Sequence, residues 1–214
     1  MLGTLKTFCT RRISDYDARR SRAIPYVELH ERHIRNLRVV LDRKALLETL
    51  PKQSVAAEIG VDHGDFSAQI LAHAAPRHLH LIDSWGSARY HEGLVNHVQQ
   101  RFQPEIAAGQ VRINRGISTE VLETFDDHTF DWVYVDTNHS YQTTAAELEL
   151  CRRKVKPHGV IAGHDYVTGN WRGWVRYGVV EAVNEFCVRH DWEIIHLTHE
   201  THRHLSFALR PIAP

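Results

Sequence analysis

The chain has 214 residues, of which 43% are hydrophobic and 24% are charged, as in an ordinary globular protein with a proper core. Its apolar runs are shorter than the roughly 20 residues of a bilayer-spanning helix, and its N-terminus lacks the apolar stretch of a secretory signal. The three cysteines are far apart and form no CxxC pair. These features favour a reduced, cytoplasmic protein without a membrane span.

The charge is unevenly distributed, although its net value is zero. Residues 1–44 hold 11 Lys or Arg and 5 Asp or Glu, and the rest of the chain carries the balancing acidic excess. We interpret residues 1–50 as an N-terminal arm with a helix over 26–50, and residues 51–214 as the main domain. A basic arm can contact nucleic acid, but this one lacks interleaved aromatic residues for base stacking. The pattern favours packing on an acidic surface instead, such as that of a partner in a homodimer.

Strand patterns alternate with helix patterns from residue 54 onward. The expected strands are 54–60, 77–83, 111–116, 130–136, 159–165, 192–198 and 204–210. The expected helices are 65–74, 88–109, 119–125, 143–155 and 178–190. Strands separated by helices form parallel βαβ units, whereas the last two strands are too close for a helical crossover. The sequence therefore predicts an α/β fold: a Rossmann-like, doubly wound, mostly parallel seven-stranded sheet with an antiparallel C-terminal edge hairpin.

The loop after the first expected strand of this sheet reads EIGVDHG, from Glu58 to Gly64. Doubly wound sheets bind ligands at the carboxyl ends of their strands. In a dinucleotide fingerprint, GxGxxG, the glycines let a pyrophosphate approach the helix N-terminus. Here Asp62 replaces such a glycine and Asp65 opens the helix, so a phosphate would be repelled. A ligand with a cationic amine or sulfonium and no phosphate, such as S-adenosylmethionine, fits these acids better.

Residues after the next two strands complete the expected cofactor site. Asp83 ends the second strand, where a carboxylate can accept two hydrogen bonds from a ribose diol. Trp85 could cover the adenine or the ribose, and Ser118 could approach the adenine edge. Helix capping or surface charge is the alternative interpretation of the acids. The predicted cofactor-binding residues are Glu58, Gly60, Gly64, Asp83, Trp85 and Ser118.

Taken together, several segments resemble class I S-adenosylmethionine-dependent methyltransferases over roughly residues 37–198: EIGVDHGDFS, HLIDSW, FDWVYVDTNHSY and KPHGVIAGHDY. The VDxxHSY and GHDY pair is similar to the subgroup that includes metal-dependent O-methyltransferases of natural-product sugars. The resemblance implies metal-ligand roles for Asp136 and Asp165. It also implies that His139 is the general base.

Two residues depart from that family pattern. Asp62 replaces the middle glycine of the family's E-x-G-x-G-x-G loop. His164 stands where metal-dependent members often carry an acid.

A hydroxyl acceptor is a poor nucleophile, so its methylation needs a base, a metal or both. Asp136, His164 and Asp165 end neighbouring strands and offer two carboxylates and an imidazole for Mg²⁺ or Mn²⁺. His139 can take up a proton near neutral pH, and with Asp136 it forms the predicted catalytic pair. Capping of the turn is the alternative role for Asp136, and ordering of the loop is the alternative for His139.

Two more patterns lie towards the C-terminus. The loop 170–178 could hold an anionic or sugar-like acceptor, or form a packed lid, through Trp171, Arg172, Trp174 and Arg176. We interpret His199, His202 and His204 as a chance cluster. His202 and His204 are expected on one strand face, far from the acids.

The sequence thus predicts an enzyme that methylates a hydroxyl oxygen of a small molecule, such as a sugar, a phenol or a natural product. A nicotinamide-dependent oxidoreductase shares the strand–glycine–helix turn, but Asp62 and the GHDY segment argue against it. A non-catalytic nucleoside-binding module would not need Asp136, His139 and Asp165. A nucleic-acid methyltransferase is disfavoured because DTNH, rather than an NPPY-like tetrapeptide, follows the fourth strand.

Overall fold

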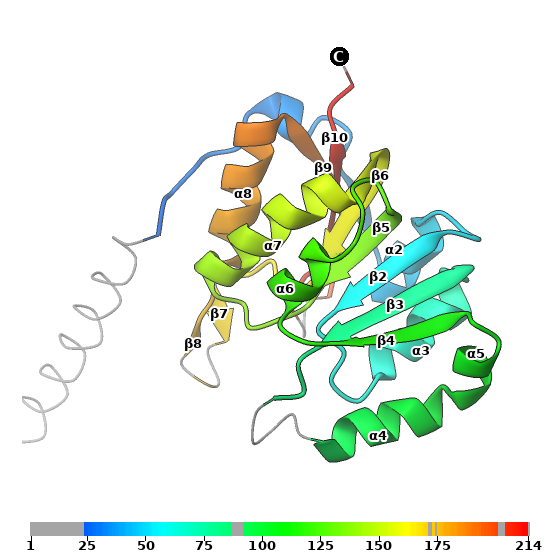
Figure 1. The fold of residues 1–214 in the computed structure, drawn as a ribbon. Helices are drawn as coiled ribbons and strands as arrows, with labels where there is room; N and C mark the ends of the chain where they lie inside the picture. The colour runs from blue at the N-terminus through cyan, green and yellow to red at the C-terminus, as the bar shows by residue number, and fades with distance from the viewer. Residues whose placement is uncertain (1–23, 87–91, 171–172, 174, 201–203, 214) are drawn as a thin grey trace, which may run out of the picture.

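The computed structural model describes residues 24–86, 92–170, 173, 175–200 and 204–213. Within these residues, eight strands form one sheet in the order β1-β9-β10-β6-β5-β2-β3-β4 (Figure 1). The strands are β1 (Arg38–Val40), β2 (Val55–Ile59), β3 (His78–Asp83), β4 (Val111–Arg115), β5 (Phe130–Val135), β6 (Val155–Gly163), β9 (Trp192–Thr198) and β10 (Phe207–Pro211). Among them, only β10 runs antiparallel to its neighbours. The predicted Rossmann-like α/β fold is confirmed.

Helices cover both faces of the sheet (Figure 1). One face carries α2 (Arg43–Thr49), α3 (Asp65–His73), α4 (Glu92–Arg101) and α5 (Gln103–Ala107). The other carries α6 (Ser118–Glu123), α7 (Tyr141–Lys154) and α8 (Val179–His190). In β5, Trp132 and Tyr134 pack under the first layer, and Val133 and Val135 pack under the second. Each buried apolar side chain stabilises the fold by about 1.5–3 kcal/mol, so β5 anchors both layers.

The predicted helix over residues 26–50 is wrong. The chain there forms the 3-10 helix η1 (Glu31–His33), then β1, then α2. Strand β1 pairs in parallel with His196–Thr198 of β9 and adds an eighth strand, one more than predicted, outside the expected hairpin. A three-residue strand is too short to show an alternating pattern. Leu37, Val40 and Leu41 are spaced as on one face of a helix, although Leu41 is 73% exposed.

Strand β2 lies at the point where the strand order reverses. Strands β3 and β4 lie on one side of it, and β5 and β6 lie on the other. Here Asp136 N, just after β5, donates to Ile59 O of β2 at 2.8 Å, so the loops that follow β2 and β5 meet. Gly60 N, just after β2, donates to Ile82 O of β3 at 2.9 Å. This edge is where a doubly wound sheet binds its ligand.

Several predictions fall on residues that the structure does not describe. They are the basic arm up to residue 23 and the side chains of Trp171, Arg172, Trp174 and His202. The homodimer and the cytoplasmic location stay predictions. Among the helices of the described residues, none combines the length and the apolar character needed to cross a bilayer.

Candidate active site

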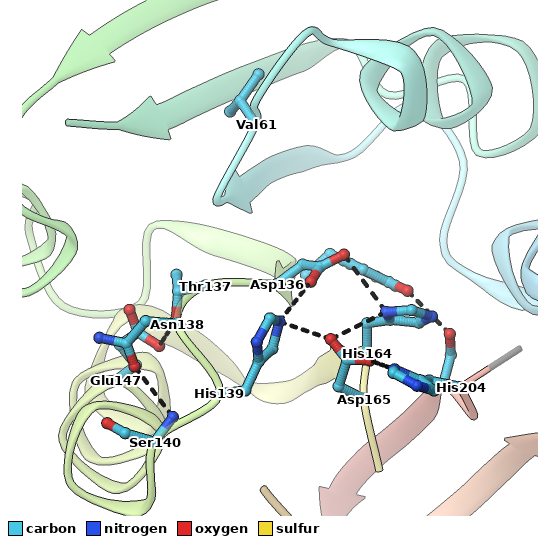
Figure 2. Close-up of polar contacts among 12 residues, drawn as sticks. Val61, Asp136, Thr137, Asn138, His139, Ser140, Glu147, His164, Asp165 and His204 are labelled. Atoms are coloured by element: carbon cyan, nitrogen blue, oxygen red, sulfur yellow. Dashed lines mark hydrogen bonds and ion pairs between the residues drawn. The ribbon is translucent and has the colours of Figure 1, made fainter. Parts of the chain in front are cut away.

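Two acids and a histidine converge at the carboxyl ends of β5 and β6 (Figure 2). Asp136 follows β5, Asp165 follows β6, and His139 lies in the loop between β5 and α7. His139 Nε2 lies 2.6 Å from Asp165 Oδ2 and 3.5 Å from Asp136 Oδ1. One ligand atom from each residue lies within 4.8 Å of the others. Among the described residues, these three thus have the spacing of a metal-binding group.

The backbone at this cluster adopts an uncommon conformation. His139 and Asp165 have φ values of 61° and 59°, in the left-handed region that non-glycine residues seldom occupy. The His139 ring stacks on Tyr177, with centroids 4.5 Å apart, and Gly178 N donates to His139 O at 2.9 Å. Such strain persists only where surrounding contacts enforce it, and it gathers at functional sites.

The acids determine the charge of His139. Burial alone lowers the pKa of His139, but hydrogen bonds and charges from Asp136 and Asp165 outweigh it and raise that pKa to about 9. Burial acts to raise the pKa of Asp165, yet hydrogen bonds from His139 and His164 hold it well below its usual range. His139 is therefore an imidazolium at neutral pH in this arrangement, and an imidazolium cannot accept a proton.

His164, the predicted third metal ligand, lies on the other side of the acids. Its Nδ1 is 3.6 Å from Asp136 Oδ2 and 3.4 Å from Asp165 Oδ2. Its Nε2 is buried and has no hydrogen-bond partner among the described residues. A cavity of about 10 Å³ beside it is lined by Val135, Asp136, Thr137, His139, Thr144, His164, Val179 and Phe207. That volume is close to the minimum that holds one water. The three side chains with metal-ligand spacing are therefore those of Asp136, His139 and Asp165. The predicted ligand His164 is not among them, although it lines the same cavity.

His204 belongs to this cluster, and its expected position far from the acids is wrong. Its Nδ1 contacts Asp165 Oδ1 (Figure 2). Its ring centroid lies 5.5 Å from that of Tyr177. Strand β10 begins only at Phe207, so His204 lies in the loop before the strand and at the rim of the sheet. The HETHRHLS segment was the only sequence signal for this residue.

Arg43 brings a permanent positive charge to the same acids. It is the first residue of α2, and its Nη1 lies 3.6 Å from Asp136 Oδ2. Its guanidinium lies over the Phe66 ring, 4.6 Å from the centroid. A single arginine in the segment predicted as the N-terminal arm carries no sequence signal of such a contact.

Glu58 lies beneath the glycine loop that follows β2. Its carboxyl group is buried, and the Ser67 hydroxyl of α3 donates a hydrogen bond to it. Burial raises the pKa of Glu58 to about 8, against its ordinary 4.5. Gly60 and Gly64 have φ values of 89° and 76°, so the loop passes over Glu58 in a conformation that favours glycine.

Asp83 and Trp85 hold this loop in place. The Asp83 carboxylate accepts hydrogen bonds from Val61 N at 2.8 Å, Asp62 N at 3.1 Å and Trp85 N at 2.9 Å. The Trp85 indole is 1% exposed and donates to Asp62 O at 3.0 Å. Asp83 therefore has only its remaining lone pairs for a diol, and Trp85 packs in the core rather than on an open surface.

Glu147 connects two of the loops at the rim. Ser118 Oγ donates to its Oε1 at 2.6 Å, and Thr137 Oγ1 donates to its Oε2 at 2.8 Å. Burial in α7 raises the pKa of Glu147 to about 7. In the sequence, Glu147 looks like one of the solvent-facing acids of the helix, so its role in joining the loops was missed.

The family of the chain follows from a family model described as a methyltransferase domain, which matches residues 57–166 and thus about half of the chain. The chain belongs to this methyltransferase family. The match contains Asp136, His139 and Asp165, whereas Arg43 and His204 lie outside it. The prediction of a methyltransferase enzyme is confirmed. A search of curated proteins gave no significant match to this methyltransferase.

Solved structures with the same fold include a SAM-dependent methyltransferase from Aquifex aeolicus, with 14% identity, 81% and 90% of the two chains covered and a TM-score of 0.60. An O-methyltransferase family protein from Burkholderia thailandensis has 10% identity, 80% and 55% coverage and a TM-score of 0.58. The pyocyanin biosynthetic protein PhzM has 12% identity, 75% and 51% coverage and a TM-score of 0.57. This methyltransferase therefore spans about half the length of the last two proteins. Similarity at such identities shows a shared fold and leaves the acceptor open.

Proposed function

We propose that this methyltransferase transfers a methyl group from S-adenosylmethionine to a hydroxyl oxygen of a small molecule, with a divalent cation held by Asp136, His139 and Asp165. The convergence of these three side chains beside the glycine loop of β2 supports the proposal. Family membership and the fold shared with the SAM-dependent enzyme from Aquifex aeolicus favour this cofactor.

The residues of the cluster fit a divalent cation. They offer two carboxylates and one imidazole, a mixed set that suits Mn²⁺ better than Mg²⁺. The neighbouring cavity of about 10 Å³ is on the scale of one small bound species. A bound cation would acidify the acceptor hydroxyl. Arg43 and His204 would hold Asp136 and Asp165 in position, because they contact the carboxylate oxygens directly.

The cofactor would lie along the neighbouring edge of the sheet. Glu58, Gly60, Gly64, Asp83, Trp85 and Ser118 stay the proposed cofactor residues. The acids on this side attract the positive amine and sulfonium of S-adenosylmethionine. In-line transfer requires the acceptor oxygen to face the methyl carbon, so the protein must hold both partners in one orientation. The junction of the β2 and β5 loops brings the two halves of such a site together.

His139 has two candidate roles. The predicted base role requires a neutral imidazole, whereas the neighbouring carboxylates favour the charged form up to a pH of about 9. A ligand role also requires a neutral imidazole, but a divalent cation held between the two acids would take the place of the proton and of its positive charge. We therefore propose His139 as a ligand and keep the base role as the alternative.

Two binding experiments test this function. Calorimetric titrations should show saturable binding of S-adenosylmethionine and its demethylated product, and no binding of NAD⁺. Electron paramagnetic resonance should show Mn²⁺ bound by the wild type and at least tenfold weaker binding by Asp165→Asn, about the loss expected when one ligand is removed. Asp126→Asn is the control, because this exposed acid precedes β5 and so lies at the amino end of that strand, away from the cluster. Dinucleotide binding without S-adenosylmethionine binding, or equal Mn²⁺ binding by Asp165→Asn and the wild type, would contradict the proposal.

The free energy of unfolding is expected to depend on pH through Glu58. Its folded-state pKa of about 8 lies above the ordinary 4.5, so the folded state prefers the protonated form. The resulting stabilisation is fully present below pH 4.5 and is lost as the pH rises through about 8. Relative to Glu58→Gln, the free energy of unfolding of the wild type should therefore fall between these pH values, by up to roughly 3 kcal/mol at pH 7. Urea denaturation at a series of pH values measures this difference.

Cofactor binding adds a second measurement on the same residue. If the cationic amine of S-adenosylmethionine approaches Glu58, binding at pH 7 should release a proton from it. Calorimetry in buffers with different ionisation enthalpies should detect this release in the wild type and not in Glu58→Gln. An equal proton release by both proteins would show that Glu58 does not respond to the cofactor.

A further inference from the structure

A second cavity lies at the β1 edge of the sheet and shares no lining residue with the acid and histidine cluster. Its volume is about 450 Å³, and it is lined by Arg35, Asn36, Leu37, Arg38, Ile195, His196 and Arg210. We propose that this cavity binds a phosphorylated small molecule. The proposal is independent of the methyl acceptor, because it depends only on the residues of β1, β9, β10 and the segment before β1.

The cavity has an excess of positive charge. Arg35 and Arg38 are exposed and have no acidic partner within the described part of the chain. Arg210 uses its Nε to donate to Glu193 Oε1 at 2.8 Å, and Asn36 Nδ2 donates to Glu193 Oε2 at 2.8 Å. The cavity lining thus contains three guanidinium groups, and among the described contacts only that of Arg210 reaches a carboxylate, the buried one of Glu193. An isolated cluster of this kind repels itself until an anion binds.

His196 adds an unsatisfied polar atom to the same cavity. Its Nδ1 is buried and has no hydrogen-bond partner among the described residues. A buried polar atom without a partner costs about 1–3 kcal/mol, and rotation of the imidazole towards an acceptor oxygen of a ligand would remove that cost. His196 is the register partner of Arg38 across β1 and β9, so both side chains lie on one face of the sheet.

An irregularity in β9 helps to shape the cavity. The register between β9 and β10 shifts beside Ile195, because Ala208 pairs with His196 while Leu209 pairs with Ile194. Such bulges bend a strand and redirect side chains, and they are common beside binding sites. Ile195 is one of the lining residues.

The arrangement fits a phosphate group better than other anions. A guanidinium matches phosphate with two parallel hydrogen bonds, and three such groups exceed the needs of a single carboxylate. A hollow of this size accommodates a diphosphate or a phosphorylated sugar. Its lining contains no Phe, Tyr or Trp, the large aromatic side chains on which the bases of a nucleic acid stack best. S-adenosylmethionine has no phosphate, so it does not compete for this cavity.

Titration with pyrophosphate and with inorganic phosphate, at constant ionic strength set by chloride, tests the proposal. The wild type should bind one pyrophosphate, more tightly than phosphate. Arg38→Gln should weaken pyrophosphate binding about tenfold, as expected for a lost charge-assisted contact. Arg112→Gln is the matched control, because Arg112 is an exposed strand arginine on β4, the opposite edge of the sheet. This control should change the affinity by less than about twofold.

Three results would overturn the proposal. One is the absence of saturable pyrophosphate binding by the wild type. Another is an equal loss of affinity in Arg38→Gln and Arg112→Gln, which would indicate general surface charge. The third is tighter binding of a single-stranded oligonucleotide with a steep salt dependence, which would indicate an extended nucleic-acid surface. Unchanged S-adenosylmethionine binding by Arg38→Gln would show that the variant is folded.

Discussion

Replacing His139 with alanine is expected to lower the rate of methyl transfer at least about 100-fold, whether the variant loses a metal ligand or, in the alternative role, an acid–base group worth roughly 10² to 10⁴. The affinity for S-adenosylmethionine should stay within about threefold of the wild type, because the proposed cofactor residues lie on other loops. The variant removes the His139 imidazole, whose Nε2 lies 2.6 Å from Asp165 Oδ2. Single-turnover rates with an acceptor identified by screening sugars and phenols measure the effect.

His190→Ala provides the control for this experiment. The His190 Nε2 atom also lies 2.6 Å from a carboxylate oxygen, that of Glu149, but on α8 and α7 rather than at the rim. Methyl transfer by His190→Ala should stay within about twofold of the wild type, because this contact lies away from the rim where the acids converge. Wild-type activity of His139→Ala would refute any catalytic role for His139.

The two roles of His139 make different predictions for Mn²⁺. As a ligand, its removal should weaken Mn²⁺ binding together with activity. As a base, its removal should spare Mn²⁺ binding, and the wild-type rate should rise with pH up to about 9, where the imidazole becomes neutral. Binding and rate measured on the same samples therefore assign the role.

The sequence was sufficient to predict the sheet and the acids at its rim. Buried apolar runs alternating with helical periodicity leave few topologies, and parallel strands place their carboxyl ends on one edge. Asp136 and Asp165 follow two such strands, so their proximity could be inferred from the order of elements alone. His139 lies only three residues after Asp136, which keeps it near the same edge.

The parts of the candidate site that the sequence could not predict depend on contacts between residues far apart in the chain. Arg43 reaches Asp136 because α2 packs beside α3, and His204 reaches Asp165 because the chain before β10 returns to the rim. Neither contact follows from a local pattern. The proposed metal ligands include His139 rather than the predicted His164, and this difference depends on side-chain direction, which strand order does not specify.

Gly60→Ala is expected to lower the free energy of unfolding more than any other glycine-to-alanine change in the loop that follows β2. A Cβ at Gly60 would lie 1.9 Å from the carbonyl oxygen of Asp136, and the φ of 89° is strained for alanine. The nearest atoms belong to a backbone that cannot rotate away, so the β2 and β5 loops would have to separate. We expect a loss of at least about 3 kcal/mol in the free energy of unfolding, the sum of backbone strain and overpacking. Urea denaturation measures that loss, and calorimetry should show that S-adenosylmethionine binding is abolished.

Gly109→Ala separates the two causes of this effect. Gly109 has a similar φ of 73°, but a Cβ there would meet no atom within 4 Å. Backbone strain alone should then cost about 1 kcal/mol and leave cofactor binding intact. Equal losses in both variants would mean that the contact between Gly60 and Asp136 adds nothing. A much larger loss at Gly60 would show that the loop over Glu58 and the loop of Asp136 are held against each other, so that cofactor binding and metal binding depend on the same backbone contact.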